Sequence, residues 1–149
     1  MTLSSLLAPE RIVPSVESGE RWPVIEELVE VLASTGTLPR EAKGDVLAAL
    51  RQREEQTSTG IGCGVAIPHA YSEAIAEVAV ALGRSEAGID FESIDNCLVR
   101  YVVLFLVPKS QSASHLKTLA AIARAFNESN IRARLDEAST ADEMLAALA

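Results

Sequence analysis

Three side chains in this sequence have types and positions that suit the handling of a phosphate group: His69, His115 and Arg53. The chain contains only two histidines. Because imidazole is the side chain whose unperturbed pKa lies near physiological pH, each histidine is a candidate nucleophile, base or metal ligand. An arginine guanidinium can bind two phosphate oxygens at once. These residues suggest a nucleophilic His69 that carries phosphate, with His115 and Arg53 stabilising it.

Each histidine is expected near the end of a strand. Val65-Ala66-Ile67 is typical of a short strand that Pro68 ends, because proline lacks a backbone donor, so His69 should begin a loop. His115 falls in the first turn of a helix that follows an apolar strand at 99–107. In a mostly parallel sheet the carboxyl ends of the strands gather at one edge, where ligands tend to bind. If these two strands run in the same direction, the two histidines should meet there.

Apolar patterning predicts the elements that must position these side chains. Helices are expected at about 22–34, from Pro39 to about 56, from about 112 to 127 and at 141–148. The strand at 99–107 should be buried on both faces, and further strands are expected at 11–13 and 78–82. The remaining predictions are a turn region at 86–91, with room for a small helical or extended piece, and a short helix or turn between 127 and 138. Strands that alternate with helices indicate one α/β domain with a mostly buried sheet.

The helix after 112 has an apolar stripe at helical spacing. We expect the following residues to lie on its buried face: His115, Leu116, Leu119, Ile122, Ala123 and Phe126.

Length and composition restrict the function classes. The 149 residues suit one domain. The net charge of −8 and the lack of a basic cluster argue against a nucleic-acid partner. The apolar run at 101–107 is too short to span a bilayer, and the N-terminus lacks the basic start of a signal peptide, so no direct membrane insertion is expected. Cys63 and Cys97 form no disulfide framework, which fits a reducing cytoplasm.

Two other kinds of site, for a nucleotide and for a metal, are less well supported by these residues. Gly60, Gly62 and Gly64 follow a helix and open a strand, whereas a dinucleotide-binding fingerprint follows a strand and opens a helix. The two histidines and a carboxylate could hold a metal, but no HExxH motif or cysteine cluster accompanies them. From the residues alone, two simpler interpretations stay open. In them His69 is a hydrogen-bonded loop histidine and Arg53 is a solvated helix end.

The segment from Arg53 to His69, REEQTSTGIGCGVAIPH, resembles the signature of fructose/mannitol-type enzyme IIA domains of the bacterial phosphotransferase system, including their nitrogen-regulatory branch. The segments 94–96, 104–108 and 115–119 are similar to the same family in order and spacing. The resemblance covers nearly the whole chain, and the glycine-Pro-His segment together with the distant His-Leu helix start is a specific combination.

The resemblance implies a single α/β domain over 1–149, with a mixed, mostly parallel sheet flanked by helices on both faces. It implies that His69 accepts a phosphoryl group, at Nε2 in family members, from a histidine-containing phosphocarrier protein. Sugar-transporting members pass the group to a IIB domain, whereas in nitrogen-type members it is a regulatory mark that controls binding to regulatory proteins. His115 matches the neighbouring histidine that hydrogen-bonds the phosphate, and Arg53 matches the assisting arginine. No metal or nucleotide cofactor is implied.

Three expectations follow for the site. Both partners must reach the histidine, so it should be exposed within a shallow apolar rim. Its pKa should lie near or below neutrality, since neutral imidazole is the nucleophile. Cys63 stands where the family usually has asparagine, which removes a side-chain amide and could alter hydrogen bonding in the loop near the site.

Overall fold

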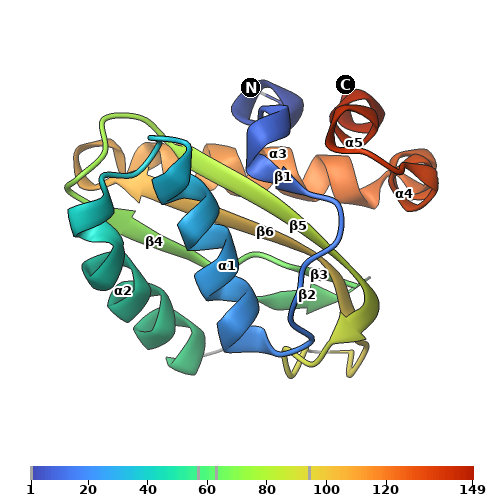
Figure 1. Ribbon diagram of the computed structural model, residues 1–149, viewed down its shortest axis with the longest axis horizontal. Helices are drawn as coiled ribbons and strands as arrows, with labels where there is room; N and C mark the ends of the chain where they lie inside the picture. The colour runs from blue at the N-terminus through green and yellow to red at the C-terminus, as the bar shows by residue number, and fades with distance from the viewer. Residues whose placement is uncertain (1, 57, 63, 94) are drawn as a thin grey trace.

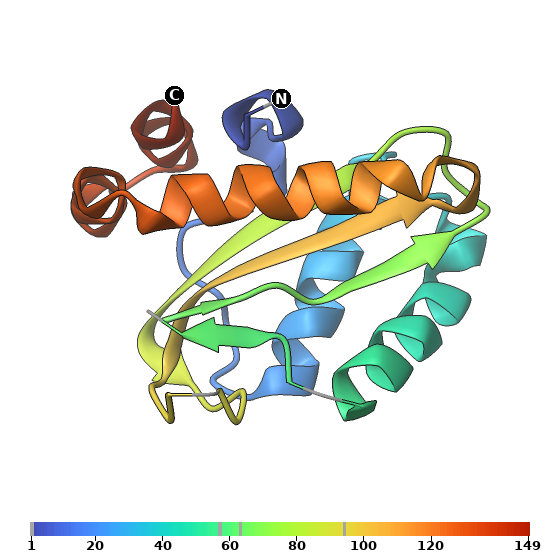
Figure 2. The same ribbon diagram turned by 180° about the vertical axis from the view of Figure 1, so that it is seen from behind.

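In the computed structural model, a mixed sheet lies between two layers of helices (Figures 1 and 2). The structure describes residues 2–56, 58–62, 64–93 and 95–149. Within these ranges the sheet has six strands: β1 (Ile12–Val13), β2 (Gly60–Gly62), β3 (Val65–Ala66), β4 (His69–Ser72), β5 (Ala79–Ile89) and β6 (Val99–Pro108).

Five α-helices occupy the described part of the chain: α1 (Arg21–Ser34), α2 (Lys43–Gln56), α3 (Ala113–Asn127), α4 (Ser129–Glu137) and α5 (Ala141–Leu148). Four 3₁₀ turns accompany them: η1 (Ser4–Leu6), η2 (Pro9–Arg11), η3 (Arg40–Ala42) and η4 (Lys109–Gln111). The predicted helices are therefore confirmed, and the segment between 127 and 138 is a helix.

Strand β6 is the centre of the sheet. It pairs antiparallel with β5 on one side, and parallel with β3 and then β4 on the other. Strand β1 joins β5 in parallel, and β2 pairs antiparallel with β3. Three of these five pairings are parallel, which confirms the mixed, mostly parallel sheet.

The side chains of β6 alternate between two apolar cores, as the pleat of a strand buried on both faces requires. Val103 and Phe105 point into the core covered by α3, α4 and α5. Val102 and Leu104 point into the core covered by α1 and α2. Figure 1 shows this arrangement, with α1 and α2 on one side of the sheet and α3 on the other. Burial on both sides explains the nearly continuous apolar run that the sequence has at 99–107.

Two details differ from the predictions. The turn expected at 86–91 is mostly strand, because β5 continues to Ile89, which pairs with Val99. The ladder is irregular between Arg84 and Ile89, and Gly88 has φ 89°, so the glycine marks an irregularity within the strand rather than its end.

The buried face of α3 also differs from the predicted stripe. Leu116 is 72% exposed and Ala123 is exposed, whereas Thr118 is fully buried. The hydroxyl of Thr118 donates to the carbonyl of Ser114 at 2.7 Å, which satisfies it inside the core. Thr118, a polar residue, thus occupies a buried position on α3, whereas the periodicity had predicted its apolar neighbours to be buried.

Candidate functional site

His69 lies within the sheet rather than in a loop. Pro68 interrupts the ladder, but the chain resumes at once as β4, in which His69 pairs with Phe105 of β6. The backbone N–H of Phe105 donates to the carbonyl of Pro68 at 3.0 Å and so keeps the pairing continuous across the break. The predicted loop and the predicted exposure of this histidine are therefore wrong: the residue is 8% exposed.

One hydrogen bond determines the protonation pattern of the His69 ring. Nδ1 lies 2.8 Å from the carbonyl oxygen of Ile67. Because a carbonyl can only accept, Nδ1 carries the proton, and in the neutral ring Nε2 keeps its lone pair. The ring also stacks on Phe105, with centroids 4.9 Å apart and an interplanar angle of 12°. His69 is thus held with Nε2 as its nucleophilic atom.

His115 lies beside His69, although it comes from α3, which follows strand β6 in the chain. Strand β6 ends at Pro108, and α3 then runs back across the sheet (Figure 2). The first turn of α3 contains His115. The two imidazole rings are edge to face, with centroids 4.8 Å apart. The ring of His115 also lies near those of Tyr71 in β4 and Phe105 in β6, with centroids 5.7 Å and 5.9 Å away. The expectation that parallel strands bring the two histidines together is confirmed.

Arg53, in the last turn of α2, completes the group of residues predicted from the sequence. With His69 and His115 it lines a cavity of about 560 Å³, which Tyr71 and Lys109 also line. Tyr71 (42% exposed) is the large exposed apolar side chain of this lining, and Leu116 is not part of it. The predicted apolar rim stays a sequence-based expectation, and the histidine inside the cavity is buried.

Electrostatics favour neutral histidines in this cavity. Burial lowers the pKa of His69, the bond to Ile67 opposes this effect, and the nearby His115 and Arg53 lower the pKa further. Burial and then the charge of Arg53 also lower the pKa of His115. A lowered pKa leaves imidazole unprotonated near neutrality, the state in which Nε2 can act as a nucleophile.

Lys109 and Phe105 are among the residues of this site that the sequence did not identify. Lys109 directly follows the strand-ending Pro108, and that placement of a cation at a strand end is a signal that could have been noticed. Phe105 looked like any other apolar residue of the central strand. Its place under the His69 ring depends on the register between β4 and β6.

The glycine segment forms a hairpin rather than a phosphate loop. Strands β2 and β3 pair antiparallel, and Gly64 between them has φ 75°, a conformation that side chains disfavour. A Cβ on Gly60 would collide with the side chain of Ser93. Cys63 lies outside the described residues, so its effect on the loop stays a sequence-based expectation.

The described residues contain neither a cluster of metal-ligating side chains nor a helix suited to span a membrane. No group of three or more His, Cys, Asp or Glu side chains among them is placed to hold a metal ion. Likewise, no helix in the described part of the chain combines the length and apolarity needed to cross a membrane.

Comparison with known proteins places these residues in context. The family model for the phosphoenolpyruvate-dependent sugar phosphotransferase system, EIIA 2, matches residues 5–149. The chain is 36% identical to the PTS system fructose-specific EIIABC component of Bacillus subtilis over 97% of its own length, but it spans only 22% of that relative. It is 34% identical to the nitrogen regulatory protein of Bradyrhizobium diazoefficiens, over its whole length and 95% of that protein.

A solved structure agrees over nearly the whole fold. The crystal structure of nitrogen regulatory protein IIA-Ntr from Neisseria meningitidis matches with a TM-score of 0.86 and 31% identity, and it covers 99% of each chain.

Proposed function

The chain belongs to the EIIA 2 family of the phosphoenolpyruvate-dependent sugar phosphotransferase system, and we propose that in it His69 is the residue that carries the phosphoryl group. The group arrives from a histidine-containing phosphocarrier protein and leaves to a IIB domain. The observation that carries this proposal is the hydrogen bond from His69 Nδ1 to the Ile67 carbonyl, which leaves Nε2 with its lone pair.

The transfer balances without a cofactor. The Nε2 lone pair attacks the phosphorus of the donor phosphohistidine, the new Nε2–P bond forms, and the donor N–P bond breaks with its electron pair returning to the donor ring. The Nδ1 proton of His69 stays in place, and the Ile67 carbonyl stabilises the positive charge that the ring acquires. A ring that keeps this proton is also a good leaving group, which suits onward transfer.

The neighbouring side chains have a supporting role in this proposal. The ring of His115 lies 4.8 Å from that of His69, close enough to hydrogen-bond a phosphoryl group on Nε2. Arg53 lines the same cavity and supplies a positive charge for the phosphoryl oxygens. Both therefore stabilise charge that develops during transfer.

The destination of the phosphoryl group has two candidates. Transfer to a IIB domain is supported by the relative named as a fructose-specific component. The alternative is a nitrogen-regulatory role, in which the phosphorylation state controls binding to regulatory proteins. It is supported by the match over 95% of a protein named nitrogen regulatory protein.

The first experiment is phosphorylation by phosphoenolpyruvate and the general components of the system. We expect labelling of the wild type, its loss in His69→Ala, and normal labelling of the control Leu98→Ala, since Leu98 is exposed and does not line the site cavity. Undiminished labelling of His69→Ala would overturn the assignment.

A second experiment separates the two destinations. The phosphorylated and unphosphorylated proteins are each mixed with a purified IIB domain and, separately, used to capture proteins from cell extract. Loss of label to the IIB domain supports sugar transfer. Capture of an identified regulatory protein by only one phosphorylation state, without transfer to IIB, supports regulation.

A further inference from the structure

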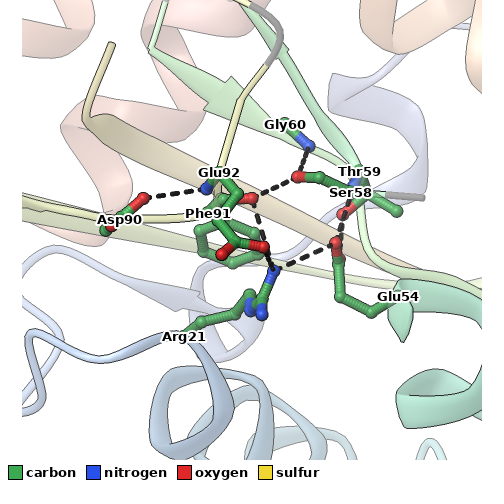
Figure 3. A network of polar contacts seen from close by, with 8 residues as sticks. All are labelled: Arg21, Glu54, Ser58, Thr59, Gly60, Asp90, Phe91 and Glu92. Carbon is green, nitrogen blue, oxygen red and sulfur yellow. Dashed lines mark hydrogen bonds and ion pairs between the residues drawn. The ribbon is translucent and has the colours of Figure 1, made fainter. Parts of the chain in front are cut away.

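A buried carboxylate close to the site is not used by the proposed chemistry. Glu54, next to Arg53 near the end of α2, is only 3% exposed. Its carboxylate accepts the backbone N–H of Thr59 at 2.7 Å and also the hydroxyl of Thr59 (Figure 3). A buried carboxylate that binds both donors of one residue holds that residue in a single orientation.

Backbone hydrogen bonds lead from Thr59 to the His69 ring. The carbonyl of Thr59 accepts the N–H of Ile67 at 3.0 Å. The carbonyl of the same Ile67 accepts Nδ1 of His69 at 2.8 Å. The bond from the Ile67 N–H to Thr59 fixes the peptide between Ala66 and Ile67. Because Pro68 follows, the ψ angle of Ile67 is restricted to extended values, so the position of that peptide, and with it Thr59, sets the direction of the Ile67 carbonyl.

The carboxylate is itself held from the opposite side. Nη1 of Arg21 in α1 lies 3.9 Å from Glu54, 3.7 Å from the carboxylate of Glu92 and 3.4 Å from the carbonyl of Phe91 (Figure 3). The positive charge of Arg21 offsets the cost of burying the Glu54 carboxylate.

Ser58 provides a second link between the start of the glycine segment and the residues after β5. Ser58 donates its hydroxyl to the carbonyl of Phe91 and accepts the N–H of Gly60 at 3.1 Å. The start of the glycine segment is thus fixed between α1, α2 and the residues after β5, and little freedom is left for Thr59.

We propose that Glu54 is a positioning residue for phosphoryl transfer, which acts through Thr59 and the Ile67 carbonyl to keep the proton of His69 on Nδ1. The inference rests on the proposed function in one respect: it takes Nε2 of His69 as the acceptor. Glu54 does not touch the reacting atoms. Its effect is on the share of His69 rings whose Nε2 lone pair is available.

The test measures this share directly, by ¹⁵N NMR of the His69 ring in the unphosphorylated protein. We expect the wild type to hold the Nδ1–H tautomer almost entirely. In Glu54→Gln the negative charge is lost and one acceptor oxygen becomes an NH2 donor, so the Thr59 hydroxyl and N–H no longer both find a carboxylate acceptor; Thr59 is held less firmly and the Nε2–H tautomer becomes populated. The rate of phosphoryl acceptance should fall roughly 10-fold, as with other groups that orient a functional histidine. Glu55→Gln, at the exposed neighbouring carboxylate, is the matched control and should leave both readings unchanged.

A pair of substitutions at Thr59 keeps the proposal testable if Glu54→Gln does not fold. Thr59→Val removes the hydroxyl at nearly constant shape and should shift the tautomer, whereas Thr59→Ser keeps the hydroxyl and should restore the wild-type spectrum. A folded Glu54→Gln protein with an unchanged tautomer would overturn the proposal, as would equal spectra for the two Thr59 variants. The tautomer does not depend on phosphorylation, so a wild type that fails to accept phosphate refutes the proposed function without deciding the role of Glu54.

Discussion

The ring of His69 lies almost parallel to the ring of Phe105, with centroids 4.9 Å apart and an angle of 12°. The two residues are register partners on the parallel strands β4 and β6. Phe105 is completely buried, so it gives the imidazole a rigid apolar support on one side. The hydrogen bond to Ile67 fixes the rotation of the ring, and this stacking fixes its tilt.

Replacing Phe105 should slow phosphoryl transfer to His69 as well as lower the stability of the fold. We expect Phe105→Leu to lower the free energy of unfolding by about 1–2 kcal/mol, through lost packing, and to reduce the rate of phosphoryl acceptance several-fold. Phe126→Leu is the matched control, because Phe126 is buried at the other end of α3 from His115. Denaturant unfolding and labelling rates measure the two effects, and equal rates in both variants would contradict a role for the stacking.

The rate should depend on pH in a specific direction. Burial lowers the pKa of His69 below its usual value near 6.5, so acceptance should stay fast down to that pH and fall only as the pH drops through the lower folded-state pKa. The contribution of His69 to the stability of the fold changes in the same direction: it falls as the pH falls. Between the two pKa values the unfolded chain binds more protons, so the contribution of His69 is complete above about pH 6.5 and is lost as the pH falls. NMR titration of the ring and labelling rates against pH measure both, and a midpoint above 6.5 would contradict the burial argument.

His115 should assist the transfer without being essential. We expect His115→Ala to accept phosphate more slowly than the wild type, or to lose it faster by hydrolysis, because a hydrogen-bond partner of the phosphoryl group is missing. The neighbouring Leu116→Ala is a control for changes at the start of α3, since Leu116 is exposed. Equal labelling rates and phosphohistidine lifetimes in His115→Ala and the wild type would argue against the supporting role.

Lys109 should affect binding of the donor more than the chemical step. It lines the site cavity at the surface, where it lies 3.3 Å from the carboxylate of Glu73. We expect Lys109→Gln to raise the KM for the phosphorylated donor about 2–5-fold with little change in kcat, the scale of an exposed charge. Lys117→Gln, an exposed lysine of α3 outside the cavity, is the charge-matched control. Identical KM values for the two variants would contradict this assignment.

Arg84 should matter for stability and not for transfer. Its guanidinium is buried and donates to the carbonyls of Pro14, Leu135 and Ala138, so Arg84→Met leaves three carbonyls without this donor. We expect a loss of about 3 kcal/mol in the free energy of unfolding. Arg100→Gln, an exposed arginine, should cost at most about 1 kcal/mol. Denaturant unfolding measures both, and similar losses would contradict the role of Arg84.

The sequence alone identified the candidate site residues and predicted much of the architecture. The apolar run at 99–107 predicted the central strand, because burial on both faces requires continuous apolar side chains. The helix predicted at 141–148 is α5, which begins with a cap in which the Thr140 hydroxyl accepts the N–H of Glu143. His69, His115 and Arg53 were selected by residue type and by their positions next to predicted elements, and all three line one cavity.

The tertiary structure decided how these residues are held. Pro68 correctly marked a break, but only pairing with β6 shows that the chain resumes as a strand and buries His69. The Nδ1 proton depends on the carbonyl of Ile67, and the position of that carbonyl depends on Thr59 and Glu54. Residue types and local periodicity specify which groups can react, because these are properties of short segments. Burial and ring stacking arise from contacts between segments distant in the chain, and the tautomer depends on a local bond to Ile67 whose partners are held by such contacts, so all three appear only once the sheet register is known.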